Sequence, residues 1–330
     1  MKKILKAREV SSFFFVAALF LVVGAISPGF LSPDNLFLTL NSSVVFTLLA
    51  AGTAFIIICG EIDVSIGAIM ALAAAVSASM IRDGSSWAAA VSVALLIGIV
   101  CGLVNGIGHV FLKIPSIIMT LGTAGIIRGL IYVYTNGKWV ENIPLDYKQI
   151  SQLNFLNISL FYWGAIIICI AGSLIMPLSK RGRYFAAVGD NINCALFLGV
   201  PIKAAKISAF VLAGIFYAVA GLMFVSRIGF VTPIAGSGYE MKAIAACVLG
   251  GVSLSGGVGS LIGAAVGALF IASVGRILVF LNSSADDNVI TGIMLLVIVT
   301  ADALLQQRAV EKARRARLSA KTEGTAANAV

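Results

Sequence analysis

Charged residues are scarce in this chain. They make up 11% of its 330 residues, whereas 60% of the residues are hydrophobic. A globular protein needs more charge than this to keep its surface in water, and the apolar runs here are long enough to cross a lipid bilayer. The composition therefore argues against a soluble domain and predicts an all-α polytopic membrane protein with about ten transmembrane helices.

The components of common enzyme and metal sites are also missing. The one histidine, His109, has no carboxylate or cysteine near it in sequence and is expected to pack, and the five cysteines lack a paired metal-binding spacing. The glycine-rich stretch 250–263 lacks the Gly-Lys-Ser/Thr of a phosphate-binding loop. We predict a protein that is not an enzyme, with no catalytic residue, no metal and no cofactor of its own.

The apolar runs define the expected spans. They cover residues 10–26, 44–59, 65–80, 87–112, 116–134, 160–178, 207–225, 241–254, 261–281 and 289–305. Residues 27–41, with two prolines, are expected to form an outer loop. Together the spans form one transmembrane domain, residues 1–305. The basic tail 306–330 lacks apolar periodicity toward its end and is expected to be disordered.

Topology explains the net charge of +9. With the N-terminus inside, sixteen Lys and Arg fall in inner segments and five in outer segments, and basic residues favour the cytoplasmic side. Both termini and the polar segment 179–206 are therefore expected in the cytoplasm. Because the charge follows membrane topology, no nucleic-acid partner is predicted.

Two glycine ladders suggest that the chain has two related halves. They are Gly98, Gly102 and Gly106 in the first half and Gly259, Gly263 and Gly267 in the second. Each ladder places small residues on one helix face, which allows close helix packing. Each also lies near short spans, and paired short spans indicate a transport pathway at the interface of two repeats.

Polar residues in or near the short spans are candidates for the translocation pathway, because carboxylates between apolar spans must face water, a pore or a partner. The candidates are Asp63, Ser65, Asn105, Thr120, Thr123, Arg128 and Glu240. Four of these residues also have a simpler interpretation that requires no pathway. Asp63 or Ser65 can cap the next helix, Arg128 can reach the interface, and Glu240 can be solvated.

The segment 179–206 is the one long polar insertion. Residues 183–198 are predicted to form a short helix, with Gly199 and Pro201 as stop signals. A short helix on the cytoplasmic face offers a surface for a partner.

Four motifs in order resemble the permease subunits of sugar-type ABC importers, the group that includes ribose, autoinducer-2 and rhamnose permeases. They are GEIDVSIG at 60–67, PSIIMTLGTAGIIRG at 115–129, GRYFAAVGDN at 182–191 and GYEMKAIAACVLGGVSLSGGVGSLIG at 238–263. The segment TNGKWV at 135–140 is more similar to the autoinducer-2 and rhamnose branches.

The resemblance implies a subunit that imports a monosaccharide or sugar-like solute across a bacterial inner membrane. It implies three protein partners besides membrane lipid: an ABC ATPase that binds ATP and Mg²⁺, a periplasmic or extracellular solute-binding protein, and a second permease subunit, identical or different. It also implies two contact surfaces. The residues expected to couple to the ATPase are Arg183, Gly189, Asp190, Asn191 and Gly199, with Gly189 as the close-approach point, and those expected to dock the binding protein are Lys138, Trp139 and Glu141.

Two other classes of protein keep the same helices. A self-contained secondary transporter needs an ion-coupling site, for which Glu61, Asp63, Glu240 and Asp302 are the available carboxylates. A membrane receptor or scaffold needs no pathway. Solute uptake driven by an ion gradient without an ATPase would identify the secondary transporter.

Overall fold

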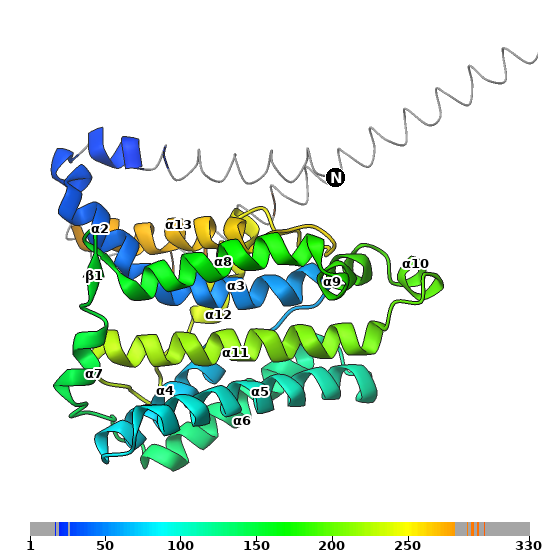
Figure 1. Ribbon diagram of the computed structural model, residues 1–330, viewed down its shortest axis with the longest axis horizontal. Helices are drawn as coiled ribbons and strands as arrows, with labels where there is room; N and C mark the ends of the chain where they lie inside the picture. Colours follow the sequence, from blue (N-terminus) through cyan, green and yellow to red (C-terminus); the bar gives the residue numbers. More distant parts are fainter. Residues whose placement is uncertain are drawn as a thin grey trace, which may run out of the picture.

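The computed structural model describes residues 17, 20–25, 27–280, 289, 292, 293, 296 and 300. These residues are mostly helical, and the long helices run along one axis (Figure 1), which confirms the all-α prediction for this part of the chain. The expected spans 10–26 and 289–305 lie largely outside the described residues. The tail 306–330 lies wholly outside them, so the domain boundary at 305 stays a prediction.

Five helices of the described part are long and apolar enough to cross a membrane. They are α5 (Trp87–Leu112), α6 (Ser116–Thr135), α8 (Leu160–Leu178), α11 (Ile202–Ile228) and α13 (Leu261–Phe280). α5 and α8 begin and end at the predicted residues. α11 extends beyond the predicted span 207–225 at both ends, beginning directly after Pro201, which is a favourable neighbour for a helix start.

The expected outer loop 27–41 is wrong. Residues Pro28–Leu31 form the 3₁₀ helix η1, and α2 (Pro33–Ser42) follows it. The sequence carries ordinary signals for this start, since the Ser32 Oγ accepts a hydrogen bond from Asn35 N at 3.4 Å and Pro33 is the first helical residue. α2 and α3 (Val44–Ile58) meet at an angle of 43°. Taken together, this bent pair is long and apolar enough to form one further span.

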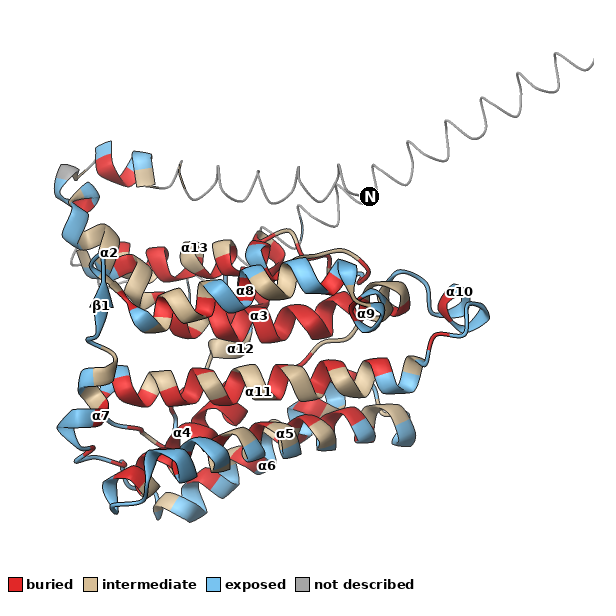
Figure 2. Cartoon of the chain, viewed as in Figure 1, coloured by how far each residue is buried: buried red, intermediate tan, exposed pale blue. Residues whose placement is uncertain are grey.

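Two shorter helices lie among the long ones. α4 (Ile66–Arg82) and α12 (Tyr239–Leu249) match the expected short spans in place. The 11 residues of α12 rise roughly 16 Å, about half of a hydrocarbon core. Buried residues dominate α3, and Figure 2 shows it as mostly red between helices whose outer faces are exposed. The interior of the fold is therefore built on α3 and α4 rather than on the longest helices.

The first glycine ladder packs two helices closely, as predicted, whereas in the second ladder only Gly263 and Gly267 stand on a helix, because Gly259 lies in the loop before α13. α11 runs between α5, α3 and α4, and the α5 ladder faces it: a Cβ at Gly106 would lie 3.0 Å from Ile207 Cα. In the second ladder, Gly267 faces the backbone of α12, where a Cβ would lie 2.9 Å from Gly250 N. Backbones in direct contact leave no room for larger residues at these positions.

The two ends of the helix bundle differ in their connections (Figure 1). At one end lie α9 (Lys180–Asp190) and α10 (Ile192–Phe197); at the other lie α7 (Leu145–Ile150) and the antiparallel strands β1 (Asn154–Phe155) and β2 (Ile158–Ser159). The single helix expected over 183–198 is wrong. The backbone of Asn191 is extended (φ −157°), and its Oδ1 accepts from Asn193 N and Cys194 N at 3.0 Å, so it ends α9 and caps α10.

Candidate translocation and coupling site

The connection between α3 and α4 is the centre of the candidate site. α3 ends at Ile58, and Gly60 adopts the left-handed conformation (φ +83°) that glycine accepts without strain. The Asp63 carboxylate then accepts hydrogen bonds from Ser65 N at 2.7 Å and Ser65 Oγ at 2.6 Å. Asp63 therefore fixes the turn that precedes α4, and the cap expected from Asp63 or Ser65 is wrong: Ser65 is the N-cap residue and its side chain makes no cap hydrogen bond.

Five of the seven predicted pathway residues meet in one hydrogen-bond network. Asn105 Nδ2 of α5 donates to Ser65 Oγ at 2.9 Å, and Thr123 Oγ1 of α6 donates to Asn105 Oδ1 at 2.6 Å. Thr120 Oγ1 accepts from the backbone N–H of Val64 at 3.0 Å. Asp63, Ser65, Asn105, Thr120 and Thr123 are each at most 8% exposed. The network is closed to solvent in this conformation.

Tyr217 of α11 joins this network, and the sequence analysis missed it. Its ring is fully buried, its hydroxyl lies 3.2 Å from Thr53 Oγ1, and it also interacts with Asp63. In the sequence it is one aromatic residue in a long apolar run, which is more often simple packing. The only available signal was that a buried tyrosine hydroxyl needs a polar partner.

Arg128 and Glu240 lie near the following turn of α4 rather than in the network itself. Arg128 Nη1 donates to the carbonyl oxygen of Ala235, and Glu240 Oε1 accepts from Gly238 N at 3.2 Å. A Cβ at Gly67 would lie 3.0 Å from Glu240 Oε2. The loop between α11 and α12 thus packs against the beginning of α4, and Arg128 of α6 holds that loop.

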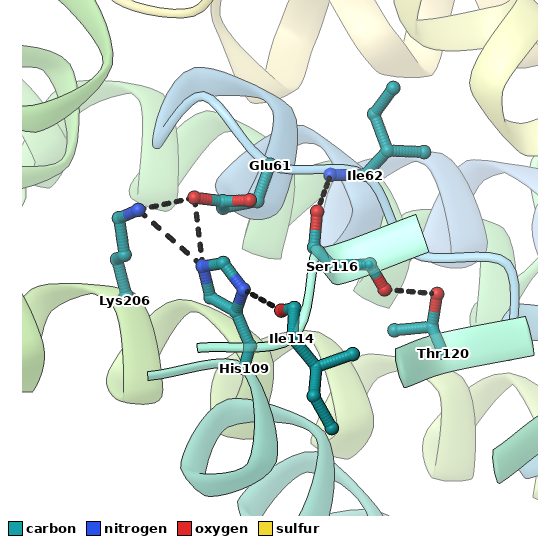
Figure 3. Close-up of polar contacts among 7 residues, drawn as sticks. All are labelled: Glu61, Ile62, His109, Ile114, Ser116, Thr120 and Lys206. Atoms are coloured by element: carbon teal, nitrogen blue, oxygen red, sulfur yellow. Dashed lines mark hydrogen bonds and ion pairs between the residues drawn. The ribbon is translucent and has the colours of Figure 1, made fainter. Parts of the chain in front are cut away.

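A charged cluster ties the same connection to two other helices (Figure 3). Glu61 Oε1 lies 3.0 Å from His109 Nε2 of α5 and forms an ion pair with Lys206 Nζ of α11. His109 Nδ1 lies 2.8 Å from the carbonyl oxygen of Ile114. Both ring nitrogens therefore face an oxygen, and three segments distant in sequence are joined through one carboxylate.

The electrostatics of this cluster favour ionised Glu61, which lies in the connection outside the helices. Burial raises its pKa, but hydrogen bonds with His109, Lys206 and Ser116 outweigh burial and lower the pKa from 4.5 to about 2. The expectation that His109 merely packs is corrected by this contact. The sequence analysis also missed Lys206 as the partner of Glu61; the available signal was that a carboxylate at the end of an apolar span needs a cation.

The predicted close-approach point, Gly189, contacts this same connection. A Cβ at Gly189 would lie 2.6 Å from Gly257 N and closer still to the carbonyl oxygen of Ile58. Gly60 Cα and the backbone of Gly189 flank Gly256, and Gly257 N donates to Ile58 O at 2.9 Å. α9, the end of α3 and the loop before α13 therefore meet backbone to backbone in a glycine joint, which we define as Gly60, Gly189, Gly256 and Gly257.

The other predicted coupling residues serve the local structure of the polar segment. Arg183 Nη1 donates to the carbonyl oxygens of Leu178 at 2.9 Å and Pro177 at 3.3 Å, at the end of α8. Asn191 caps α10, Asp190 is the last residue of α9, and Gly199 (φ +71°) has open space around its Cα. α10 exposes an apolar tip of Leu196, Phe197 and Leu198, with Phe197 91% exposed.

The predicted docking residues lie at the opposite end. Trp139 is 57% exposed and stacks on Phe230, with ring centroids 5.4 Å apart. Next to it, Val140 and Val231 exchange backbone hydrogen bonds of 2.8 and 3.0 Å. Lys138 and Glu141 are exposed on either side. In the part of the chain that the structure describes, no group of three or more His, Cys, Asp or Glu side chains is arranged to hold a metal ion.

Comparison with known sequences decides the family. A profile described as "Branched-chain amino acid transport system / permease component" matches residues 35–299. The chain belongs to this permease family. This confirms the predicted resemblance to importer permeases, and the family is one of transport rather than catalysis. With its apolar helices, this permease is a multi-pass protein of the bacterial inner membrane.

Several relatives carry the name "Autoinducer 2 import system permease protein LsrC". The permease is 41% identical to the protein of Enterobacter sp. (strain 638) over 308 residues, which is 93% of this chain and 90% of the relative. It is 40% identical to that of Klebsiella pneumoniae over 308 residues, with the same coverage. It is 39% identical to that of Escherichia coli over 307 residues, again 93% and 90%. No solved structure matches the chain.

Proposed function

We propose that this permease is the membrane-spanning subunit of a binding-protein-dependent ABC importer that moves autoinducer-2 or a related sugar-like solute into the cytoplasm. The observation that carries the proposal is an identity of 39–41% over about nine tenths of both chains to permeases of autoinducer-2 import. ATP and Mg²⁺ are bound by a separate ATPase, since the sequence has no phosphate-binding loop of its own.

The polar segment 179–206 is the contact to the ATPase. The exposed apolar tip of α10 suits a groove on a partner better than it suits water. A displacement of α10 is transmitted through Asn191, which separates the two helices, to α9 and its residue Gly189. Because no side chain lies between Gly189 and the backbone at the end of α3, the displacement reaches α3. Gly189 thus acts within this chain, and Arg183, Asp190, Asn191 and Gly199 shape the contact surface.

The translocation pathway runs along the beginning of α4. Asp63, Ser65, Asn105, Thr120 and Thr123 form its closed inner part, and Arg128 with Glu240 lies one turn further along the helix. A shift of the α3–α4 connection breaks hydrogen bonds that the solute's hydroxyl groups can replace. Weak polar contacts suffice here, because the solute-binding protein supplies affinity.

The complete subunit has about ten spans in two related halves, with both termini and segment 179–206 in the cytoplasm. Residues 1–305 form the transmembrane domain and 306–330 a cytoplasmic tail. A second permease subunit, identical or different, completes the pathway. The solute-binding protein docks at the opposite end, on the surface that carries Lys138, Trp139 and Glu141.

Reconstitution tests the function directly. The permease is placed in liposomes with its ATPase and solute-binding protein, and uptake of labelled autoinducer-2 is measured with and without ATP. We expect uptake that requires ATP and both partners. Uptake driven by an ion gradient in liposomes that contain the permease alone would instead establish the secondary transporter. A Lys180→Cys variant tests the orientation: reaction of this cysteine with a membrane-impermeant thiol reagent added from the periplasmic side would contradict the proposed cytoplasmic location of segment 179–206.

A further inference from the structure

A pocket of about 330 Å³ lies where α5 ends and α11 begins. Its walls combine cations with apolar side chains: Lys113, Lys203, Lys206 and His109 line it together with Val110 and Ile202. Lys113 directly follows α5 in the left-handed conformation (φ 56°), and Lys203 stands in the first turn of α11. Four basic side chains from two helices therefore converge on one small volume.

The charge in this pocket is not balanced. Glu61 engages Lys206 and His109, but it carries a single negative charge. Among the described residues, no carboxylate forms an ion pair with Lys113 or Lys203. Lys203 Nζ lies 5.3 Å from the centroid of the Phe111 ring, and both lysines are exposed. At least two positive charges at the pocket mouth remain available to an anion.

The pocket is suited to a phosphate group rather than to a halide or a carboxylate. A lysine ammonium offers three donors, and a phosphate ester offers several acceptor oxygens, so one phosphate can bind several ammonium groups at once. Val110 and Ile202 give the group's organic substituent an apolar wall, and Phe111 and Leu112 beside the pocket are 58% and 68% exposed. Basic pockets between transmembrane helices bind phospholipid head groups by the same combination.

We propose that this pocket binds a phosphate ester, carried either by an anionic phospholipid or by a small phosphorylated solute. Lys113 and Lys203 make the first contact, and Lys206 and His109 form the base of the site. Because these two also hold Glu61, the bound phosphate shares its cations with the α3–α4 connection. The proposal rests on the proposed function only for the statement that this end faces the cytoplasm.

Two arms of one experiment separate the sources of phosphate. The full-length permease in detergent is mixed with phosphatidylglycerol or with phosphatidylcholine, and retained lipid is counted by native mass spectrometry. In the other arm, sn-glycerol 3-phosphate is titrated into lipid-depleted permease in a calorimeter. The variants Lys113→Gln, Lys203→Gln and their double are compared with Lys180→Gln, an exposed lysine at the same end that does not line the pocket.

We expect each single variant to weaken binding about fivefold and the double variant about 25-fold, while Lys180→Gln changes it less than twofold. If the double variant retains less phosphatidylglycerol than the wild type, the site is assigned to lipid. If the double variant instead binds sn-glycerol 3-phosphate more weakly than the wild type, the site is assigned to a soluble ester. Absence of binding in both arms, or equal binding by the double variant and Lys180→Gln, would overturn the proposal. The assay contains no ATPase or binding protein, so its result is independent of whether autoinducer-2 is transported.

Discussion

Two adjacent parts of the α3–α4 connection are held in opposite ways. At Gly60, three backbone segments meet with no side chain between them, because Gly189 and Gly256 approach from α9 and from the loop before α13. A few residues later, at Asp63 and Ser65, the connection is held by side-chain hydrogen bonds that extend to α5 and α6.

The difference suggests a division of labour. Backbone in van der Waals contact is nearly incompressible, so a displacement of α9 has to move the end of α3. Hydrogen bonds between side chains can exchange one partner for another with little net cost, provided that each group finds a new partner. The glycine joint is therefore suited to transmit motion and the polar network to open and close.

The largest effect is expected at the joint. In Gly189→Ala the new Cβ overlaps Ile58 O and Gly257 N, so backbones must separate. We expect a loss of ATP-driven uptake of about tenfold or more with ATP hydrolysis retained, and destabilisation of about 1–3 kcal/mol. Uptake and hydrolysis are measured in proteoliposomes.

Gly164→Ala in α8 is the matched control, since nothing lies within 4 Å of a Cβ there. We expect it to transport normally. Equal uptake by the two variants would show that the joint does not transmit the motion.

The next effect is expected in the network. Asp63→Ala leaves Ser65 N without its acceptor in a buried place, which costs about 2–3 kcal/mol in the free energy of unfolding. Asp63→Asn keeps an acceptor oxygen and is expected to cost about 1 kcal/mol. Unfolding in detergent is followed by circular dichroism, with Asp34→Ala, an exposed carboxylate in the first turn of α2, as control. A cost for Asp63→Ala no greater than the control's would refute the structural role.

The charged cluster links the two parts and is expected to show a pH dependence. The pKa of Glu61 is lowered in the folded state from 4.5 to about 2, so its stabilisation is fully present above pH 4.5 and is lost as the pH falls toward 2. Glu61→Gln removes this stabilisation, which we place at about 1–2 kcal/mol. The difference in unfolding temperature between wild type and Glu61→Gln should therefore be larger at pH 5 than at pH 3. A constant difference down to pH 3 would argue against the ion pair.

The smallest effect on the fold is expected far from both parts. Trp139→Ala removes the exposed ring that stacks on Phe230 and should change the free energy of unfolding by less than about 1 kcal/mol. If this surface docks the solute-binding protein, uptake falls several-fold and the loss is recovered at high concentrations of that protein. Tyr134→Ala, at the same end of α6, serves as the exposed aromatic control. If uptake by Trp139→Ala depends on the concentration of the solute-binding protein in the same way as wild-type uptake, this surface is not part of the docking site.

Much of the helical framework is encoded locally and was predicted from the sequence. An apolar run that starts after Ser86, whose Oγ accepts from Ala89 N, and ends before Lys113 defines α5 without reference to any other segment. The polar candidates around Asp63 were also found, because a carboxylate or amide between apolar spans is conspicuous. The helix over 183–198 was wrong because Asn191 caps α10 only when the chain turns there.

The sequence by itself determined the membrane class, the bounds of helices such as α5 and α8, and the family, since each depends on composition or on contiguous motifs. Only the tertiary structure decided which distant groups meet. His109 and Lys206 are 97 residues apart and converge on Glu61, and Gly189 packs against α3 rather than standing free for a partner. The physical reason is that ion pairing and close backbone contact depend on distances in space, which helix packing sets and sequence spacing does not contain.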